Sequence, residues 1–266
     1  MTEAGPVPDG IEEDRPSVAR LYDFFLGGHH NFAADRELGR KLLAAEPNAR
    51  LIVRENRAFL GRAVKFMIGA GVRQFIDLGS GIPTQENVHE IAQGAAAEAR
   101  VIYVDNDPVA VAHSRQILTG NPLAAVVAAD LRQPEAVLAH PKVAELIEFR
   151  QPVGLLMVTV LHFVPDSDDP AGIVRRFAAA LPAGSFLAIS HATHEAAPGT
   201  AAQVQDLYRS TTASAHTRTH AEILRLFDGF DLVEPGLVYL PLWRPDGPVP
   251  ERPEEAWFYA GVGRKG

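Results

Sequence analysis

An α/β fold with a mostly parallel sheet is predicted by three observations. Short apolar runs alternate with segments of helical spacing through the middle of the chain, at 72–78, 100–104, 123–129, 153–160 and 185–190. This alternation is typical of βαβ units, whose parallel sheet is buried on both faces. Acidic residues lie at the ends of the first three runs, and a glycine-containing bend follows the first. Two further runs, 232–240 and 257–262, have no helix between them and predict an antiparallel C-terminal hairpin, which completes a seven-stranded sheet.

An N-terminal helical extension is expected before the first strand. Its helices begin near Pro16, Asp35 and Pro47, and the third runs to about Ala70. Apolar residues recur at helical spacing in each, and Gly27-Gly28 ends the first. We therefore expect three parts: a flexible acidic tail at 1–14, a helical cap or lid at 15–71, and one α/β domain at 72–266.

Helices are also expected between and after the strands. Thr84 is a good N-cap for the first of them, and Asp107-Pro108 supplies a cap and an N1 proline for the second. The predicted helical segments are 84–97, 107–118, 133–148, 171–181, 200–213 and 219–228.

Composition excludes several classes of protein. The chain has 266 residues, a formal net charge of −8 and no cysteine. The acidic balance is unlike that of a general nucleic-acid binder, and disulfides and thiolate metal sites are excluded. No apolar run approaches the roughly 20 residues of a membrane helix, and no secretion signal is evident. A cytoplasmic protein is expected, whose oligomeric state the sequence does not predict.

The chemistry-bearing motif is the bend Phe75-Ile-Asp-Leu-Gly-Ser-Gly-Ile-Pro-Thr84. Gly79 and Gly81 leave bare backbone where a ligand can approach, and ligands of open α/β sheets bind at the carboxyl ends of the strands. Asp105, at the end of the second strand, can accept hydrogen bonds from ribose hydroxyls. Asp130, after the third strand, can reach an adenine amino group.

Two other nucleotide classes fit this bend poorly. A dinucleotide site requires G-x-G-x-x-G, but Thr84 occupies the third glycine position. A phosphate-binding P-loop requires Gly-Lys-Ser/Thr after the glycines, and that sequence does not follow. A nicotinamide dehydrogenase and a P-loop nucleotidase are therefore both disfavoured.

These motifs together resemble a known class. Asp77-x-Gly79-x-Gly81, Asp105, Asp130-Leu131 and the run 158–166 look like a class I S-adenosylmethionine-dependent methyltransferase. The segment 17–36, with 55–60 and 259–263, resembles an actinobacterial S-adenosyl methyltransferase family formerly described as a domain of unknown function. The resemblance covers residues 15–263 and implies a Rossmann-like class I methyltransferase fold with S-adenosyl-L-methionine as cofactor. Pro83 departs from the wider class, so the bend should bind the methionine part through the backbone of Gly79–Gly81.

The resemblance and the strand ends together predict the cofactor contacts. They are expected at Gly79, Ser80, Gly81, Asp105, Asn106, Asp130, Leu131, Thr159 and Val160, and on a lid at Tyr22, Gly28 and Asn31. The segment around Gly28 has a second interpretation, as a simple helix stop and turn. Asn56 and Arg57 fit either the cleft or a solvated helix face.

The acceptor side is predicted from histidines after strand ends. His162 and His191 follow the fourth and fifth strands, where a neutral imidazole can act as a base or contact an acceptor. A hydrogen-bonded structural histidine is the alternative for each.

His216 and His220 have helical spacing for two metal ligands, but no third ligand is evident and no metal site is expected. Trp243 and Tyr239 fit either an acceptor wall or core packing.

The predicted function is direct methyl transfer from the sulfonium to an acceptor. Leu161-His162-Phe163 lacks the Asn/Asp-Pro-Pro-Phe/Tyr motif of amino-methylating nucleic-acid enzymes, which favours a small-molecule acceptor. The alternative is a non-catalytic protein that binds S-adenosylmethionine or S-adenosylhomocysteine. The sequence does not predict which compound is methylated.

Overall fold

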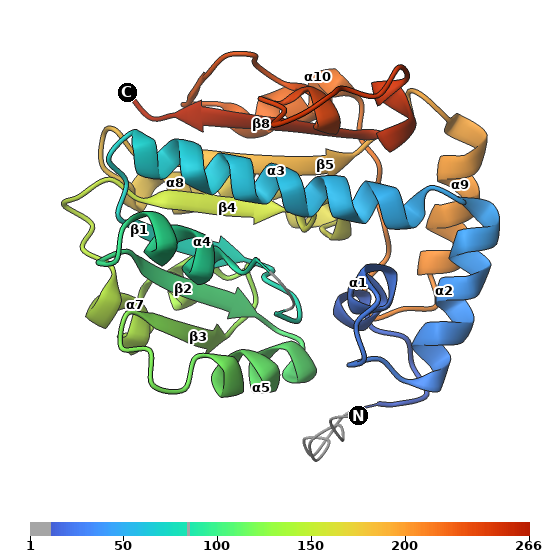
Figure 1. The fold of residues 1–266 in the computed structure, drawn as a ribbon, viewed down its shortest axis with the longest axis horizontal. Helices are drawn as coiled ribbons and strands as arrows, with labels where there is room; N and C mark the ends of the chain where they lie inside the picture. The colour runs from blue at the N-terminus through green and yellow to red at the C-terminus, as the bar shows by residue number, and fades with distance from the viewer. Residues whose placement is uncertain (1–11, 84–85) are drawn as a thin grey trace.

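The structure is a computed structural model that describes residues 12–83 and 86–266. A twisted sheet is covered by helices on both faces, and the first two helices stand beside it (Figure 1). Among the described residues, none of the helices is both long and apolar enough to cross a membrane. The expected tail at 1–14 lies mostly outside the described residues.

The sheet confirms the predicted fold class. Its parallel strands run in the order β3-β2-β1-β4-β5, and the strand that follows β5 is antiparallel to it. The strands are β1 Gln74–Leu78, β2 Arg100–Asp105, β3 Ala124–Ala128, β4 Gly154–Val158, β5 Phe186–Ala192, β6 Asp231–Leu232, β7 Val238–Tyr239 and β8 Phe258–Arg264.

The C-terminal hairpin differs from the prediction in one respect. The expected strand 232–240 is two short strands, β6 and β7, which both pair antiparallel with β8. Between them Pro235 has no N–H to donate to a ladder, and Gly236 turns the chain at a φ of 88°. The described sheet therefore contains eight short strands.

Two helical segments also differ from their predicted boundaries, because of local capping and proline residues. The helix after the glycine bend begins at Val88 instead of Thr84, because Asn87 and Glu90 form a capping box there; Thr84 itself lies outside the described residues. The segment 133–148 divides in two, since Pro141 opens a second short helix that His140 caps. The body helices are α4 Val88–Ala95, α5 Pro108–Ile117, α6 Pro134–Leu138, α7 Pro141–Leu146, α8 Pro170–Ala180, α9 Pro198–Tyr208 and α10 His220–Leu224.

The N-terminal extension forms α1 Val18–Leu26, α2 Ala33–Ala45 and α3 Ala49–Gly69. Helix α3 runs along the face of the sheet (Figure 1), where its Phe59 and Met67 join the same buried cluster as Phe75 and Leu156. It therefore belongs to the helical layer of the α/β body. Of these three helices, α1 and α2 lie apart from the sheet, packed on α3 and α9.

Alternate strand residues build two cores, one on each face of the sheet. Ile76 and Leu155 pack with α8, whereas their neighbours Phe75 and Leu156 pack with α3. This is the period of two expected for a strand with both faces covered. Trp243 is fully buried in the α3-side core, so its core interpretation holds.

Candidate active site

A cavity of about 750 Å³ opens at the carboxyl ends of β1, β2 and β4. Its walls come from these strand ends, from α1, α3 and α9, and from the segment 212–217. The volume lies within the usual range for small-molecule sites. The sequence predicted a ligand at this edge of the sheet, and the cavity is located there.

The glycine bend contributes bare backbone to the cavity. Gly79 and Gly81 both have left-handed φ values, 70° and 66°. A Cβ atom on Gly79 would lie 2.2 Å from a methyl of Val160, so any larger residue would displace the end of β4. Gly81 has open space around it, and its requirement is the left-handed backbone alone.

Asp105 ties the bend to the end of β2. One carboxylate oxygen accepts a hydrogen bond from Gly81 N at 2.7 Å, and the other accepts one from Asp107 N at 2.8 Å. The side chain is buried and lines the cavity, and burial raises its pKa to about 6. Asp105 thus lies at the cavity wall, as the ribose-binding prediction requires.

Asp77 is a second buried carboxylate on the same wall. Burial raises its pKa to about 7; Arg57 lowers the pKa and Asp105 raises it further. Within the described residues its carboxylate accepts no hydrogen bond, although it faces the cavity. A buried carboxylate of this kind fits a cationic ligand group, because a cation would favour its ionised form.

Asp130 shares its carboxylate with an arginine that the sequence analysis did not single out. Arg132 lines the cavity, and its Nη2 lies 2.6 Å from Asp130 and its Nη1 lies 3.1 Å from Asp168. Partial burial raises the pKa of Asp130, and hydrogen bonds from Arg132 outweigh that effect and lower it. Asp130 is therefore ionised at the cavity edge, where its carboxylate already pairs with Arg132.

A chain of hydrogen bonds joins the end of β4 to α1. Thr159, at a left-handed φ of 58°, donates its N–H to Ser190 Oγ at 3.0 Å. Ser190 donates to Asn56 Oδ1 at 2.5 Å, and Asn56 Nδ2 donates to the Tyr22 hydroxyl at 3.0 Å. Asn56 therefore faces the cavity and not solvent. Strained backbone at Thr159, beside a ligand cavity, is typical of functional sites.

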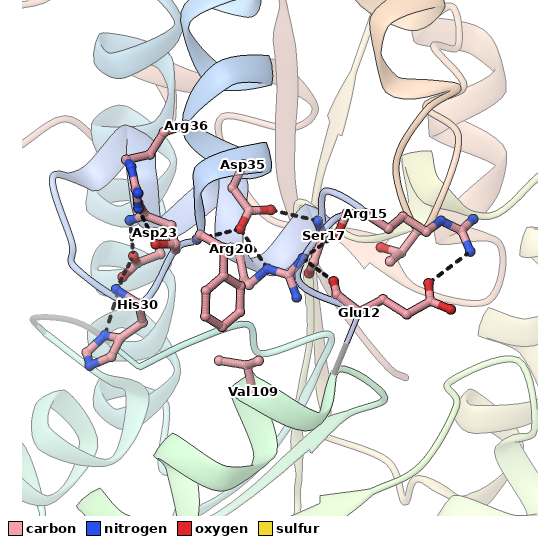
Figure 2. Close-up of polar contacts among 12 residues, drawn as sticks. Glu12, Arg15, Ser17, Arg20, Asp23, His30, Asp35, Arg36 and Val109 are labelled. Atoms are coloured by element: carbon pink, nitrogen blue, oxygen red, sulfur yellow. Dashed lines mark hydrogen bonds and ion pairs between the residues drawn. The ribbon is translucent and has the colours of Figure 1, made fainter. Parts of the chain in front are cut away.

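The first two helices are held by a buried ionic group (Figure 2). The Asp35 carboxylate, fully buried, accepts hydrogen bonds from Arg20 Nε at 2.7 Å, Ser17 N at 2.9 Å and Phe32 N at 2.8 Å. Ser17 also donates its hydroxyl to Asp107 at the start of α5. The cluster thus joins α1 to α2 and to the body beside the cavity.

Gly28 and Asn31 are not part of the cavity wall. A Cβ atom at Gly28 would lie 1.9 Å from Asp23 Oδ1, and Asn31 Nδ2 donates to Asp23 Oδ2 at 2.8 Å and to Gly28 O at 2.9 Å. Their polar groups close the turn after α1. Of the three residues predicted for the lid, Tyr22 lines the cavity, and Gly28 and Asn31 do not.

The two candidate histidines lie in different surroundings. His162, in the 3₁₀ turn Leu161–Phe163, lines the cavity. Burial holds its pKa well below the usual value, with smaller effects of the same sign from His191, Arg218 and His216. Its Nδ1 is enclosed without a hydrogen-bond partner among the described residues. His162 is therefore a neutral imidazole at the cavity wall.

His191 has a structural environment instead. Its Nε2 accepts a hydrogen bond from Arg218 Nη1 at 2.7 Å, so Nδ1 carries the proton and donates to Ala192 O at 2.8 Å. It is fully buried and does not line the cavity, which corrects the prediction that it opens to the acceptor side. Arg218 also donates to Leu161 O and Val164 O, and so holds the turn that carries His162.

Other parts of the wall come from residues that the sequence analysis did not place at the cofactor or acceptor site. Gln205 and Tyr208 project from α9, His216 lies in the segment after it, and Trp257 and Phe258 lie at the start of β8. No motif marks Gln205 or Tyr208, because the packing of α9 against α2 brings them to the cavity.

The order β3-β2-β1-β4-β5, with an antiparallel β8 beside β5 and a cavity over the glycine bend, is the arrangement of class I S-adenosylmethionine-dependent methyltransferases. Residues 5–266 match the sequence model of the S-adenosyl methyltransferase family, and the chain belongs to that family. It is thus an S-adenosylmethionine-dependent methyltransferase, as predicted.

Two solved structures are similar to this chain over nearly its whole length. A DUF574 family protein from Streptomyces avermitilis MA-4680 is 40% identical, with 96% of this chain and 100% of that chain covered and a TM-score of 0.91. A candidate methyltransferase from Thermobifida fusca YX is 39% identical, with 98% and 99% covered and a TM-score of 0.93. The N-methyltransferase NodS from Bradyrhizobium japonicum shares the fold alone, at 14% identity, 82% and 98% coverage and a TM-score of 0.50. A search of curated proteins found no match.

Proposed function

We propose that this methyltransferase acts on a small-molecule acceptor that binds in the same cavity as the cofactor. One observation carries the proposal: the cavity continues from the glycine bend past His162 to Tyr208 on α9. A non-catalytic binder of S-adenosylmethionine would need only the first part of that space. The walls from α1 and α9 favour a compact acceptor over a polymer, since both helices enclose the acceptor side.

Each cofactor group has a matching residue in this proposal. Asp105 accepts the ribose hydroxyls, the backbone of Gly79–Gly81 faces the methionine part, and Asp130 with Leu131 borders the adenine. Asp77 receives the ammonium group, because its buried carboxylate lacks a hydrogen-bond partner among the described residues. Bound S-adenosylmethionine supplies an electrophilic methyl group, so the protein's task is to position the acceptor and exclude water.

The proposal is tested by binding and transfer on the full chain. S-adenosylhomocysteine is expected to bind in calorimetry, and NAD is not. Transfer of labelled methyl from S-adenosylmethionine into a small-molecule fraction of a bacterial extract should follow. Label found only in nucleic acid or protein would contradict the small-molecule acceptor, and cofactor binding without any transfer would favour the non-catalytic alternative.

Cofactor binding should depend on pH through Asp77. Its pKa of about 7 means that part of the population is protonated near neutrality. An ammonium group beside the carboxylate lowers that pKa, so binding releases protons and affinity rises as pH increases from about 6 to 8. Calorimetry in buffers of different ionisation enthalpy measures the released protons. The variant Asp77→Asn should release fewer, and equal release by both proteins would rule out Asp77 as the source.

His162 is the proposed acceptor-side base. Because its pKa is well below 6.5, the neutral base persists at neutral pH, and kcat/KM should stay flat from pH 8 to about 6.5. His162→Gln should lower kcat by about 10²-fold or more while the affinity for S-adenosylhomocysteine stays near that of wild type. His216→Gln, from the same wall, is the matched control. An unchanged kcat in His162→Gln would exclude the base role.

A further inference from the structure

The cavity has two ends of different character. We call the part beyond His162 the acceptor end; it is lined by Ile52, Phe163, Val204, Gln205, Tyr208 and Trp257. Most of these side chains are apolar or aromatic, and they come from α3, from the 3₁₀ turn after β4, from α9 and from the start of β8. A substrate that displaces water here gains from apolar contact.

Charge is distributed unevenly between the two ends. Most aspartate, glutamate, lysine and arginine side chains of the described wall lie at the cofactor end, namely Arg57, Asp77, Asp105, Asp107, Asp130 and Arg132. At the acceptor end the described wall contains Glu46, whose carboxylate accepts a hydrogen bond from Asn48 N at 2.8 Å. No lysine or arginine of the described wall lies there to pair with a carboxylate or phosphate, and burying an unpaired charge is costly.

Aromatic rings give the acceptor end a preferred shape of ligand. The rings of Phe163 and Tyr208 lie 5.6 Å apart at 45°, and those of His162 and Phe258 lie 5.4 Å apart at 90°. Rings at such distances stack on, or meet edge-to-face with, another flat ring. A flat aromatic compound therefore suits this space better than a sugar or an aliphatic chain.

Two polar groups of α9 are available to a substituent of the ligand. The Tyr208 hydroxyl forms no hydrogen bond to the rest of the described chain, and burial raises its pKa, so it stays a neutral phenol. The Gln205 side chain donates to Thr217 Oγ1 at 3.1 Å, which leaves its carbonyl as an acceptor. With the neutral imidazole of His162, these groups recognise a hydroxyl and not an ion.

We propose that the methyl acceptor is an uncharged, flat aromatic compound with a hydroxyl group, which binds at the acceptor end; this rests on the function proposed above. The hydroxyl oxygen forms a bond to the methyl carbon, and the bond between that carbon and sulfur breaks. The electron pair stays on sulfur, and the hydroxyl proton passes to His162. The products are a methyl ether, S-adenosylhomocysteine and a protonated imidazole, so charge balances.

The test uses three probes with one ring system and different charge. Full-length protein saturated with S-adenosylhomocysteine is titrated at pH 7 with 2-naphthol, 2-naphthoate and 2-naphthylmethylamine. 2-Naphthol is expected to bind at least about tenfold more tightly than 2-naphthoate, because no lysine or arginine of the described acceptor end pairs with a carboxylate. It should also bind more tightly than 2-naphthylmethylamine, because the Glu46 carboxylate of the described wall is already held by Asn48 N. Labelled S-adenosylmethionine with 2-naphthol should then yield 2-methoxynaphthalene.

Two α9 variants connect this binding to the acceptor end. Tyr208→Ala should weaken 2-naphthol binding about tenfold by removing one aromatic wall, and leave the affinity for S-adenosylhomocysteine within about threefold of wild type. Gln203→Ala, on an exposed position of α9 outside the cavity wall, should change neither.

The outcomes separate the two proposals. Absence of S-adenosylhomocysteine binding would overturn the cofactor site itself. Normal S-adenosylhomocysteine binding without preference for 2-naphthol, or with equal 2-naphthol affinity in Tyr208→Ala, would overturn the acceptor class and leave the methyltransferase function standing.

Discussion

Asp105→Ala is expected to lower the affinity for S-adenosylhomocysteine by at least about a hundredfold. Two charge-assisted hydrogen bonds to ribose hydroxyls together contribute about 3–6 kcal/mol at most. The same substitution frees Gly81 N and Asp107 N, which the carboxylate now holds at 2.7 and 2.8 Å. The bend over which the cofactor lies thus loses its link to β2, and both effects act in the same direction.

Calorimetry measures this loss, and thermal unfolding shows whether the sheet remains intact. Asp130→Ala is the matched control, since its carboxylate is already shared with Arg132 and is more exposed than that of Asp105. It should cost about tenfold or less. Near-normal affinity in Asp105→Ala would show that the ribose lies elsewhere.

Asp35→Ala is expected to unfold α1 and α2 while the sheet stays folded. The substitution leaves the buried guanidinium of Arg20 without its carboxylate, and the N–H groups of Ser17 and Phe32 without an acceptor. Breaking a buried pair in this way costs about 3–5 kcal/mol. Because the first two helices pack on the body through few elements, the loss should be local.

Hydrogen exchange separates local from global unfolding. Amides in 18–45 should lose protection in Asp35→Ala, whereas those of β1 and β4 should keep it, and cofactor affinity should fall because Tyr22 leaves the cavity wall. Glu37→Ala is the control on the same helix, since that side chain is 69% exposed and pairs only with Lys41 in the described chain. Full protection of 18–45 in Asp35→Ala would contradict the role of this buried pair.

Residues predicted for the site line the cavity where local rules decide their position. Gly79, Gly81 and Asp105 lie at the cavity because a bend and a strand end are set by neighbouring residues. Two predicted residues do not line the cavity, because other parts of the protein hold their side chains. The amide of Asn31 binds the carboxylate of Asp23, and the ring of His191 lies between a backbone carbonyl and Arg218.

Other wall residues depend on contacts between distant parts of the chain. Asn56 faces the cavity because Ser190, 134 residues away, donates to its side chain. Tyr208 reaches the acceptor end because α9 packs on α2. The sequence of neither helix indicates that the other is its packing partner. Hydrophobic periodicity indicates that one face of a helix is buried, but it does not indicate which other element covers that face.

By itself, the sequence determined the βαβ order, the glycine bend, the strand-end aspartates and the methyltransferase family, because all four depend on residues close together in the chain or on the identity of short motifs. Only the tertiary structure decided which helices enclose the cavity, that His162 and not His191 faces it, and that its acceptor end is aromatic and nearly free of charge. These properties arise from packing between segments that the chain separates by tens to more than a hundred residues, and no local pattern records that packing.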